Sequence, residues 1–407
     1  MGSGTKTGMK NGMAAKEWLP LVGISLTAFV FNTSEFMPVA LLVDIAADFG
    51  VSEAQAGILI TGYAWAVCLL SPPLMIVTSR FGFKPLMLAL VALFGACQVA
   101  SALSPGYWWL MAARIGVACT HAVFWSIASI VATRVVAVQH RSIALSAVVM
   151  GSSVAMICGL PLGRMVGLAL GWRATFLCVA AVAFLALAYL AAVLPKLPAG
   201  EPFSVRQLPL LFKNPVLAGL YVMVAVFTTG YYTGYSYIEP FLMQVGGLSE
   251  GVITAALSVF GVAGIAGSLL FARLYEGRRR RHAVLLGVMA GISCALLLLA
   301  PAAGSVVAAF AVCVLWGACS TVFNAAGQAE VLRFTEPDEA SVAMSFYSGI
   351  YNLGIGGGSA VGGLVSTWAS MGAVGFAGGA VAAAGAALCA FVLIPAMNRA
   401  ADKGKAR

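Results

Sequence analysis

Residues 174–194 read ATFLCVAAVAFLALAYLAAVL, and the stretch that follows, residues 195–214, reads PKLPAGEPFSVRQLPLLFKN. The first stretch carries no charge and is long enough for a helix to cross the ~30 Å hydrocarbon core of a bilayer. The second contains four prolines and three basic residues, so it cannot continue that helix. Together the two stretches predict a chain of membrane-spanning helices that is divided into two parts at residues 195–214.

The whole composition agrees with that interpretation. Hydrophobic residues make up 61% of the chain and charged residues only 9%, whereas soluble proteins contain about 25% charged residues. This excludes a secreted enzyme, a nucleic-acid-binding module and a disordered scaffold. A transmembrane β-barrel would show short alternating segments of about ten residues, but the apolar runs here are about twice as long. The predicted fold class is therefore an all-α membrane protein.

Apolar runs separated by charges, prolines and glycines predict twelve transmembrane helices. They lie near residues 18–42, 54–78, 85–103, 107–132, 143–170, 174–194, 215–241, 249–272, 283–302, 305–330, 340–366 and 371–395. We expect two six-helix halves, 18–194 and 215–395, joined by a cytoplasmic linker, 195–214, and flanked by cytoplasmic tails, 1–17 and 396–407. Two related halves are typical of transporters, in which the binding site lies between them.

The basic residues predict the orientation of the chain. There are 23 Lys and Arg against 14 Asp and Glu, which gives a net charge of +9. With the N-terminus inside, every Lys and Arg except Arg114, Arg164 and Arg173 falls on the cytoplasmic side, as the positive-inside rule requires. Both termini should be cytoplasmic. The positive charge is then explained by topology and by contact with anionic lipid headgroups, so no nucleic-acid partner is expected.

Charged side chains inside a bilayer are costly and are therefore candidates for function. Glu35 lies within the first predicted helix, with Asn32 on the same face, and Arg114 and His121 lie two turns apart in the fourth, with Trp125 one turn further. We expect Glu35, Arg114 and His121 to form a titratable proton-coupling cluster. The alternative is a static ion pair between Glu35 and Arg114, with His121 hydrogen-bonded in the core.

A second group of polar side chains predicts the substrate site. Thr228, Tyr232, Tyr235 and Glu239 recur every three or four residues, on one face of a helix. Tyrosine rings with hydroxyl groups suit a sugar, although an interfacial aromatic belt or hydrogen bonds between helices are alternatives. The candidate substrate-binding residues are Asn32, Trp125, Tyr232, Tyr235, Glu239, Asn324, Gln328 and Asn352.

Small residues in the run 143–170 form a different kind of site. Gly159, Pro161 and Gly163 remove side-chain bulk, and we expect them to allow close sliding contact between the halves, with plain helix packing as the alternative. The nine cysteines show no metal-ligand or redox spacing, so we expect buried free thiols. Neither a metal nor a cofactor is expected.

Several motifs resemble those of one transporter family. Residues 31–36 (FNTSEF) followed by Pro38, the spacing Leu-x-x-x-Arg at 110–114, and residues 159–164 (GLPLGR) followed by 171–173 (GWR) resemble the bacterial drug:proton antiporters of the major facilitator superfamily. The resemblance implies the major facilitator fold of twelve helices in two halves, proton-coupled efflux by alternating access, and a place in the bacterial inner membrane.

Three further blocks are more specific. Residues 121–127 (HAVFWSI), 235–241 (YSYIEPF) and 349–354 (GIYNLG) look like the sugar efflux branch of that group. This resemblance implies export of molecules similar to arabinose or thiogalactosides.

The loop between the second and third predicted helices departs from the family pattern Gly-x-x-x-Asp-Arg-x-Gly-Arg-Lys. Arg80, Gly82 and Lys84 match that pattern and are expected to act in conformational change. The acidic position is Ser79, so the charge network of this loop lacks its acid.

Together these features predict a proton-coupled exporter of sugars or sugar-like molecules. The alternative within transport is a broad-specificity drug or metabolite exporter. A non-transporting receptor or assembly subunit is less favoured because no soluble signalling domain is evident, and no set of residues predicts an enzyme. The expected partners are a sugar-like molecule, protons and membrane lipid, and the expected state is a monomer.

Overall fold

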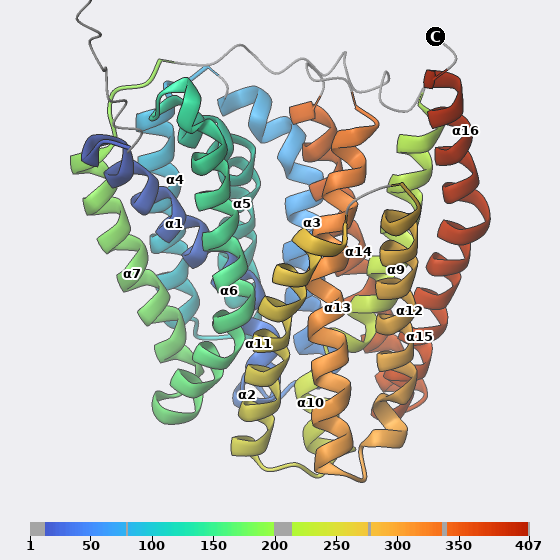
Figure 1. The fold of residues 1–407 in the computed structure, drawn as a ribbon. Helices are drawn as coiled ribbons and strands as arrows, with labels where there is room; N and C mark the ends of the chain where they lie inside the picture. Colours follow the sequence, from blue (N-terminus) through green and yellow to red (C-terminus); the bar gives the residue numbers. More distant parts are fainter. Residues whose placement is uncertain (1–12, 79, 199–213, 276–277, 336–339, 406–407) are drawn as a thin grey trace, which may run out of the picture.

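The computed structural model describes residues 13–78, 80–198, 214–275, 278–335 and 340–405, and these residues form helices and connecting turns without a strand (Figure 1). The first half contains α1 (Ala15–Ala40), α2 (Leu42–Phe49), α3 (Glu53–Thr78), α4 (Phe83–Ala102), α5 (Tyr107–Arg134), η1 (Val138–His140), α6 (Arg141–Leu170) and α7 (Trp172–Val193). The second contains α9 (Pro215–Tyr235), α10 (Ile238–Gln244), α11 (Glu250–Leu274), α12 (Arg278–Ala302), α13 (Val306–Arg333), α14 (Ala340–Trp368), η4 (Met371–Ala373), α15 (Val374–Leu388), η5 (Cys389–Leu393) and α16 (Ile394–Lys405).

The predicted fold class is confirmed. Ten stretches of the described helices are long and apolar enough to cross a membrane. With α6 and α14, of 30 and 29 residues, the described chain has the twelve crossings of the predicted architecture, six in each half. In this arrangement α9 and α10 form one crossing, α15, η5 and α16 form another, and α2 is a short additional helix.

Each half has its own apolar core. In the first half the rings of Phe31, Phe94 and Phe124 stack at its centre. The core of the second half is built around α9 and α13, and it also takes in residues near the end of α1 and the start of α3. The exact boundaries of the halves stay a prediction, since 199–213 of the linker, 1–12 of the first tail and 406–407 of the last lie outside the described residues.

The first helix of each half is interrupted at the same end of the bundle. α1 contains Pro38 and ends at Ala40, and α2 begins at Leu42. In the second half α9 ends at Tyr235 and α10 begins at Ile238. Proline has no N–H for the preceding turn, so Pro240 cannot donate to residue 236 within the second break, and Pro38 weakens the last turns of α1 before the first. α2 and α10 lie at the end of the bundle opposite α16 and the start of α1 (Figure 1); we call this the far end.

This break corrects one prediction. We expected Glu239 to continue the helical face of Tyr232 and Tyr235, but Glu239 lies in α10, beyond the end of α9. The helix period therefore does not carry through residues 236 and 237, and Glu239 belongs to the far end of the bundle.

The two halves are joined towards the far end. There α3 packs on α14, and the Thr61 hydroxyl donates to the Gly356 carbonyl at 3.2 Å. The Ser359 hydroxyl donates to the Gly57 carbonyl at 3.0 Å in the same contact. A Cβ at Gly356 would lie 2.3 Å from the Trp65 ring, so glycine is required for this close approach.

The glycines of α6 lie against α1. A Cβ at Gly159 would lie 3.2 Å from the Thr33 Cα, and one at Gly163 would lie 3.3 Å from the Met37 side chain. Both neighbours belong to α1, in the same half, and Pro161 lies buried between these glycines. In this structure Gly159 and Gly163 therefore allow α1 and α6 to pack closely within one half, which agrees with the alternative of plain helix packing, and sliding contact between the halves stays a prediction.

Candidate functional site

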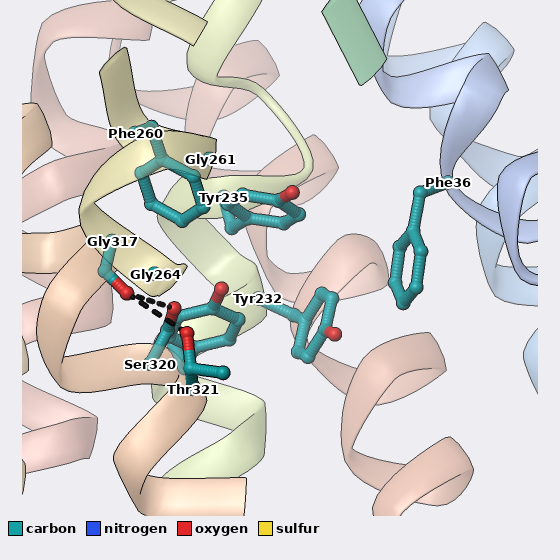
Figure 2. A pocket seen from close by; sticks show the side chains of 10 residues that line it. Phe36, Tyr232, Tyr235, Phe260, Gly261, Gly264, Gly317, Ser320 and Thr321 are labelled. Carbon is teal, nitrogen blue, oxygen red and sulfur yellow. Dashed lines mark hydrogen bonds between the residues drawn. The ribbon is translucent and has the colours of Figure 1, made fainter. Parts of the chain in front are cut away.

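An aromatic pocket lies between α9, α11 and α13 and faces α1 (Figure 2). Its lining residues are Phe36, Tyr231, Tyr232, Tyr235, Phe260, Gly261, Gly264, Gly317, Ser320 and Thr321. The rings contact each other: Tyr235 lies 5.4 Å from Phe260 and 5.5 Å from Tyr232, measured between centroids. The lining contains hydroxyl groups and aromatic faces, and none of its residues carries a charge.

Helix geometry explains why these side chains meet. Tyr232 and Tyr235 are three residues apart on α9, and Tyr231 stacks on Tyr235 with 5.3 Å between ring centroids. Gly317 allows α13 to pack closely on α11, since a Cβ there would lie 2.0 Å from the Phe260 carbonyl oxygen. The hydroxyls of Ser320 and Thr321 donate to the Gly317 carbonyl (Figure 2). Of the predicted substrate-binding residues, this pocket contains Tyr232 and Tyr235.

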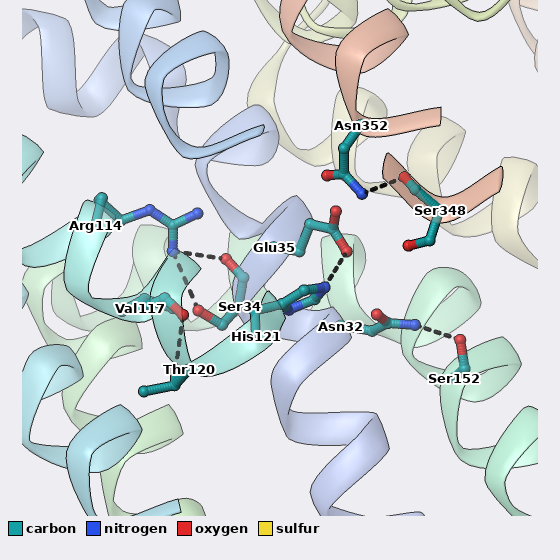
Figure 3. A network of polar contacts seen from close by, with 10 residues as sticks. All are labelled: Asn32, Ser34, Glu35, Arg114, Val117, Thr120, His121, Ser152, Ser348 and Asn352. Atoms are coloured by element: carbon teal, nitrogen blue, oxygen red, sulfur yellow. Dashed lines mark hydrogen bonds and ion pairs between the residues drawn. The ribbon is translucent and has the colours of Figure 1, made fainter. Parts of the chain in front are cut away.

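A buried acid lies directly beside this pocket along the chain. Glu35 precedes Phe36, and its Oε2 is 3.5 Å from the His121 Nε2 (Figure 3). The two side chains are only 9% and 3% exposed. Aromatic rings surround the imidazole, with Trp125 at 6.0 Å and Tyr63 at 5.7 Å between centroids. Two of the three residues of the predicted proton-coupling cluster are thus in contact.

Arg114 is held at a different point of α1. Its Nη1 donates to the Ser34 carbonyl at 2.9 Å and to the Ser34 hydroxyl at 3.1 Å. That carbonyl is available because Pro38, four residues on, has no N–H to donate to it. The Gln98 side chain also donates to the Ser34 hydroxyl. Among the described contacts Arg114 has no ion pair with Glu35, so the alternative of a static Glu35–Arg114 pair is absent from this structure.

The amide side chains bond mainly to nearby groups. Asn32 donates to the Ser152 hydroxyl of α6. Asn352 donates to the Ser348 carbonyl at 3.0 Å, within α14, while its Oδ1 is buried without a partner in the structure (Figure 3).

The third amide pair lies on α13. Gln328 donates to the Asn324 side chain at 2.8 Å. The structure therefore places Asn32 near Glu35 along α1, and it does not place Asn324, Gln328 or Asn352 in the aromatic pocket.

Glu239 joins the two halves at the far end. Arg164 of α6 donates to the Glu239 carboxylate, and both side chains are 1% exposed. Arg164 also donates to the Ala40 carbonyl at 3.1 Å, and Glu239 accepts from the Leu42 amide at 3.0 Å. The cation therefore lies at the carbonyl end of α1 and the anion at the amide end of α2, as the helix dipoles favour. We call this contact the far-end ion pair.

Among the described contacts, the α3–α4 loop and the start of α4 contact the end of α7 and the start of the linker. The Lys84 ammonium donates to the carbonyls of Ala191 and Leu194 at 2.9 and 2.5 Å, at the end of α7. Gly82 precedes α4, and a Cβ there would lie 3.1 Å from the Leu197 carbonyl, while Arg80 is exposed. Ser79, at the missing acidic position, lies outside the described residues.

With the fold and site in place, comparison identifies the family. The sequence profile of the Major Facilitator Superfamily matches residues 24–326. The chain belongs to the major facilitator superfamily. It is therefore a multi-pass membrane protein with the fold that supports transport of small molecules by alternating access between two halves.

Solved structures show the same fold at low sequence identity. Two inward-facing structures of a bacterial homologue of the human lysosomal transporter Spinster, one unoccupied and one occupied, each have a TM-score of 0.69. They share 18% and 19% identity with the chain, and each alignment covers 95% of it and 96% of the homologue. A mutant peptide transporter POT in complex with alafosfalin has a TM-score of 0.74 at 13% identity, over 93% of this chain and 94% of that one.

Sequence reasoning missed several residues of this site. Ser34, Gln98 and Tyr63 surround Arg114, and Arg164 is the partner of Glu239. Gln98 could have been found, because it is a polar side chain in an apolar run. Tyr63 could not, because a single tyrosine in a membrane helix is common and its contact with Arg114 depends on how α3 packs against α5.

Proposed function

We propose that this transporter exports neutral, sugar-like small molecules in exchange for protons. One observation carries the proposal: Glu35, which contacts His121 of α5, directly precedes along α1 the residue Phe36, which lines an uncharged aromatic pocket. A proton site and a substrate site would then lie side by side between the halves.

The proton part of the proposal follows from the partner of Glu35. A carboxylate in an apolar environment is stabilised by protonation, whereas a nearby cation stabilises its charged form. An imidazole such as that of His121 can be neutral, whereas an arginine always carries its charge. An acid whose contact is a histidine can therefore exchange its proton as the halves move. We assign Glu35 as the proton carrier, with His121 and Arg114 setting its affinity for the proton.

The substrate part follows from the pocket. Aromatic faces pack against the C–H groups of a sugar, and tyrosine, serine and threonine hydroxyls exchange hydrogen bonds with its hydroxyls. No carboxylate lines the pocket, so an organic cation would lack a counter-charge there. This favours sugar-like molecules over the cationic drugs of the alternative proposal, and it agrees with the sequence blocks that resemble the sugar efflux branch.

The proposed orientation has both termini on the cytoplasmic side of a bacterial inner membrane. The far end is then the outside, where the far-end ion pair joins the two halves. Each unit of pH difference across the membrane supplies about 1.36 kcal/mol per proton, and each 100 mV of membrane potential supplies about 2.3 kcal/mol per proton. One proton can therefore maintain a roughly hundredfold substrate gradient.

Reconstituted protein tests the substrate and the coupling together. Vesicles loaded with radiolabelled arabinose or with a thiogalactoside are given a pH gradient, and substrate and proton fluxes are both recorded. The proposal expects substrate movement against its gradient with protons moving in the opposite direction. Proton-driven movement of a cationic drug, with neither sugar transported, would instead support the broad drug exporter.

A further inference from the structure

We infer that Tyr63 is a positioning residue for the proton site: its ring holds the Arg114 guanidinium on Ser34 and away from Glu35, which leaves Glu35 to His121. This inference rests on the proposed role of Glu35 as the proton carrier. It concerns a residue of α3 that the sequence motifs do not include.

The ring of Tyr63 lies against the side chains of both Arg114 and His121. The Arg114 guanidinium carbon is 4.4 Å from its centroid, over the ring face, and the His121 ring meets it edge to face at 5.7 Å. Tyr63 is itself 2% exposed. A guanidinium over an aromatic face is stabilised by the ring quadrupole, more strongly where water is excluded. The tyrosine therefore fixes one face of Arg114 while Ser34 accepts its Nη1 hydrogen bonds.

The remaining donors of Arg114 make this positioning necessary. Its Nε and Nη2 are buried without a hydrogen-bond partner in the structure, and Glu35 is the residue directly after its anchor, Ser34. A buried guanidinium with unused donors gains strongly from an adjacent carboxylate. Without the ring over its face, Arg114 would be free to turn towards Glu35.

Such an ion pair would stop proton exchange. Arginine stays charged at every physiological pH, so a direct contact would hold Glu35 as the carboxylate. The titratable and charged groups near Glu35 are His121 and Arg114 from α5, Tyr63 from α3, and Tyr232 and Tyr351 from α9 and α14. Arg114 is the one with a permanent charge, so its placement has the largest effect.

The environment of the Tyr63 hydroxyl indicates that the aromatic ring, and not the hydroxyl, positions Arg114. The hydroxyl oxygen is buried and has no hydrogen-bond partner in the structure. Phenylalanine keeps the aromatic face and removes this unsatisfied group, so Tyr63→Phe should preserve function. Leucine removes the face and should not.

The test measures proton-driven sugar efflux against external pH in proteoliposomes, for Tyr63→Phe and Tyr63→Leu. We expect Tyr63→Leu to move the pH of half-maximal efflux about one unit or more to lower pH, because a paired Glu35 needs more acid to accept a proton. Tyr63→Phe should match the original protein. In an Arg114→Gln background, Tyr63→Leu should cause no further shift, because the residue that it releases is absent.

One control variant, one replacement variant and one parallel test keep the outcomes distinct. The control is Phe176→Leu, which removes an equally buried ring of the first half and should leave the pH of half-maximal efflux unchanged. If Tyr63→Leu fails to fold, Tyr63→Met replaces it as the variant without an aromatic ring. Glu35→Gln, measured in parallel, tests the carrier itself: if it pumps normally, the proposed function fails. If Glu35→Gln is uncoupled, three results would overturn the positioning role of Tyr63. Tyr63→Leu could behave as the original protein, or it could shift the pH of half-maximal efflux in the Arg114→Gln background as well. Tyr63→Phe could also cause the same shift as Tyr63→Leu.

Discussion

Replacing Glu239 by glutamine should open the far end of the transporter. The substitution removes the charge that Arg164 contacts across the two halves, while leaving the shape of the side chain and an oxygen that can still accept from the Leu42 amide. Arg164 would then be a buried cation without a counter-charge as long as the far end stays closed. Opening would expose it to water.

The size of the effect follows from the burial of the pair. Removing one partner of a buried ion pair costs about 3–5 kcal/mol, and both side chains here are 1% exposed. Since the glutamine oxygen can keep the amide bond to α2, we take the lower figure, about 3 kcal/mol. This cost falls on the closed far end alone, so the ratio of closed to open molecules should fall by roughly 100-fold.

Spin labels at the far end measure this ratio. Ser52, before α3, and Ser249, before α11, are exposed, and a cysteine at each in a cysteine-free background gives a distance by pulsed electron resonance. Glu239→Gln should populate a longer distance. The matched control is Asp48→Asn, which breaks the Arg173–Asp48 pair within the first half. Those side chains are 39% and 40% exposed, so their pair contributes little and the distances should not change.

The reasoning would be refuted by a Glu239→Gln distance distribution that matches both the original protein and Asp48→Asn. The far-end ion pair would then hold local structure only, and closure would have to depend on the α3–α14 contact.

Three further predictions address topology, substrate and packing. A cysteine at Ser249 should react with an impermeant reagent outside intact cells, whereas one at Ser204, in the part of the linker outside the described residues, should not; labelling of Ser204 from outside would contradict the orientation. Tyr235→Ala should weaken sugar affinity by roughly 10- to 100-fold, about 1–3 kcal/mol for a lost hydrogen-bonding group, in equilibrium binding; unchanged affinity would move the site elsewhere. Gly151→Ala should lower the melting temperature, because its Cβ would lie 2.2 Å from the Ser25 carbonyl oxygen and overpacking costs about 1–3 kcal/mol. The control Gly349→Ala should leave the melting temperature unchanged, because its Cβ would meet no neighbouring atom within 4 Å.

The fold could be predicted from the sequence because few backbone structures can cross a bilayer. Helices of about 20 apolar residues are required to cross it, so the apolar runs predicted all twelve crossings. Glu35 and His121 were found for a similar reason, since a titratable group in an apolar run is costly and therefore conspicuous.

The contacts between helices were less accessible from the sequence. Gly159 and Gly163 look the same whether they face the other half or α1, because sequence gives the face of a helix and not its neighbour. Glu239 was placed on the wrong helix because the helical period was extended past residues 236 and 237, where the chain bends before Pro240. The partner of Arg114 likewise depended on the Ser34 carbonyl that Pro38 leaves free, a link between two helices that no local pattern records.

The most direct test of the account is Glu35→Gln in proteoliposomes, assayed for proton-driven efflux and for sugar counterflow without a pH gradient. The account predicts that uphill efflux is lost, because glutamine cannot carry a proton, while counterflow and sugar binding remain. A Glu35→Gln protein that still pumps at the original rate under a pH gradient would contradict the assignment of Glu35 as the proton carrier.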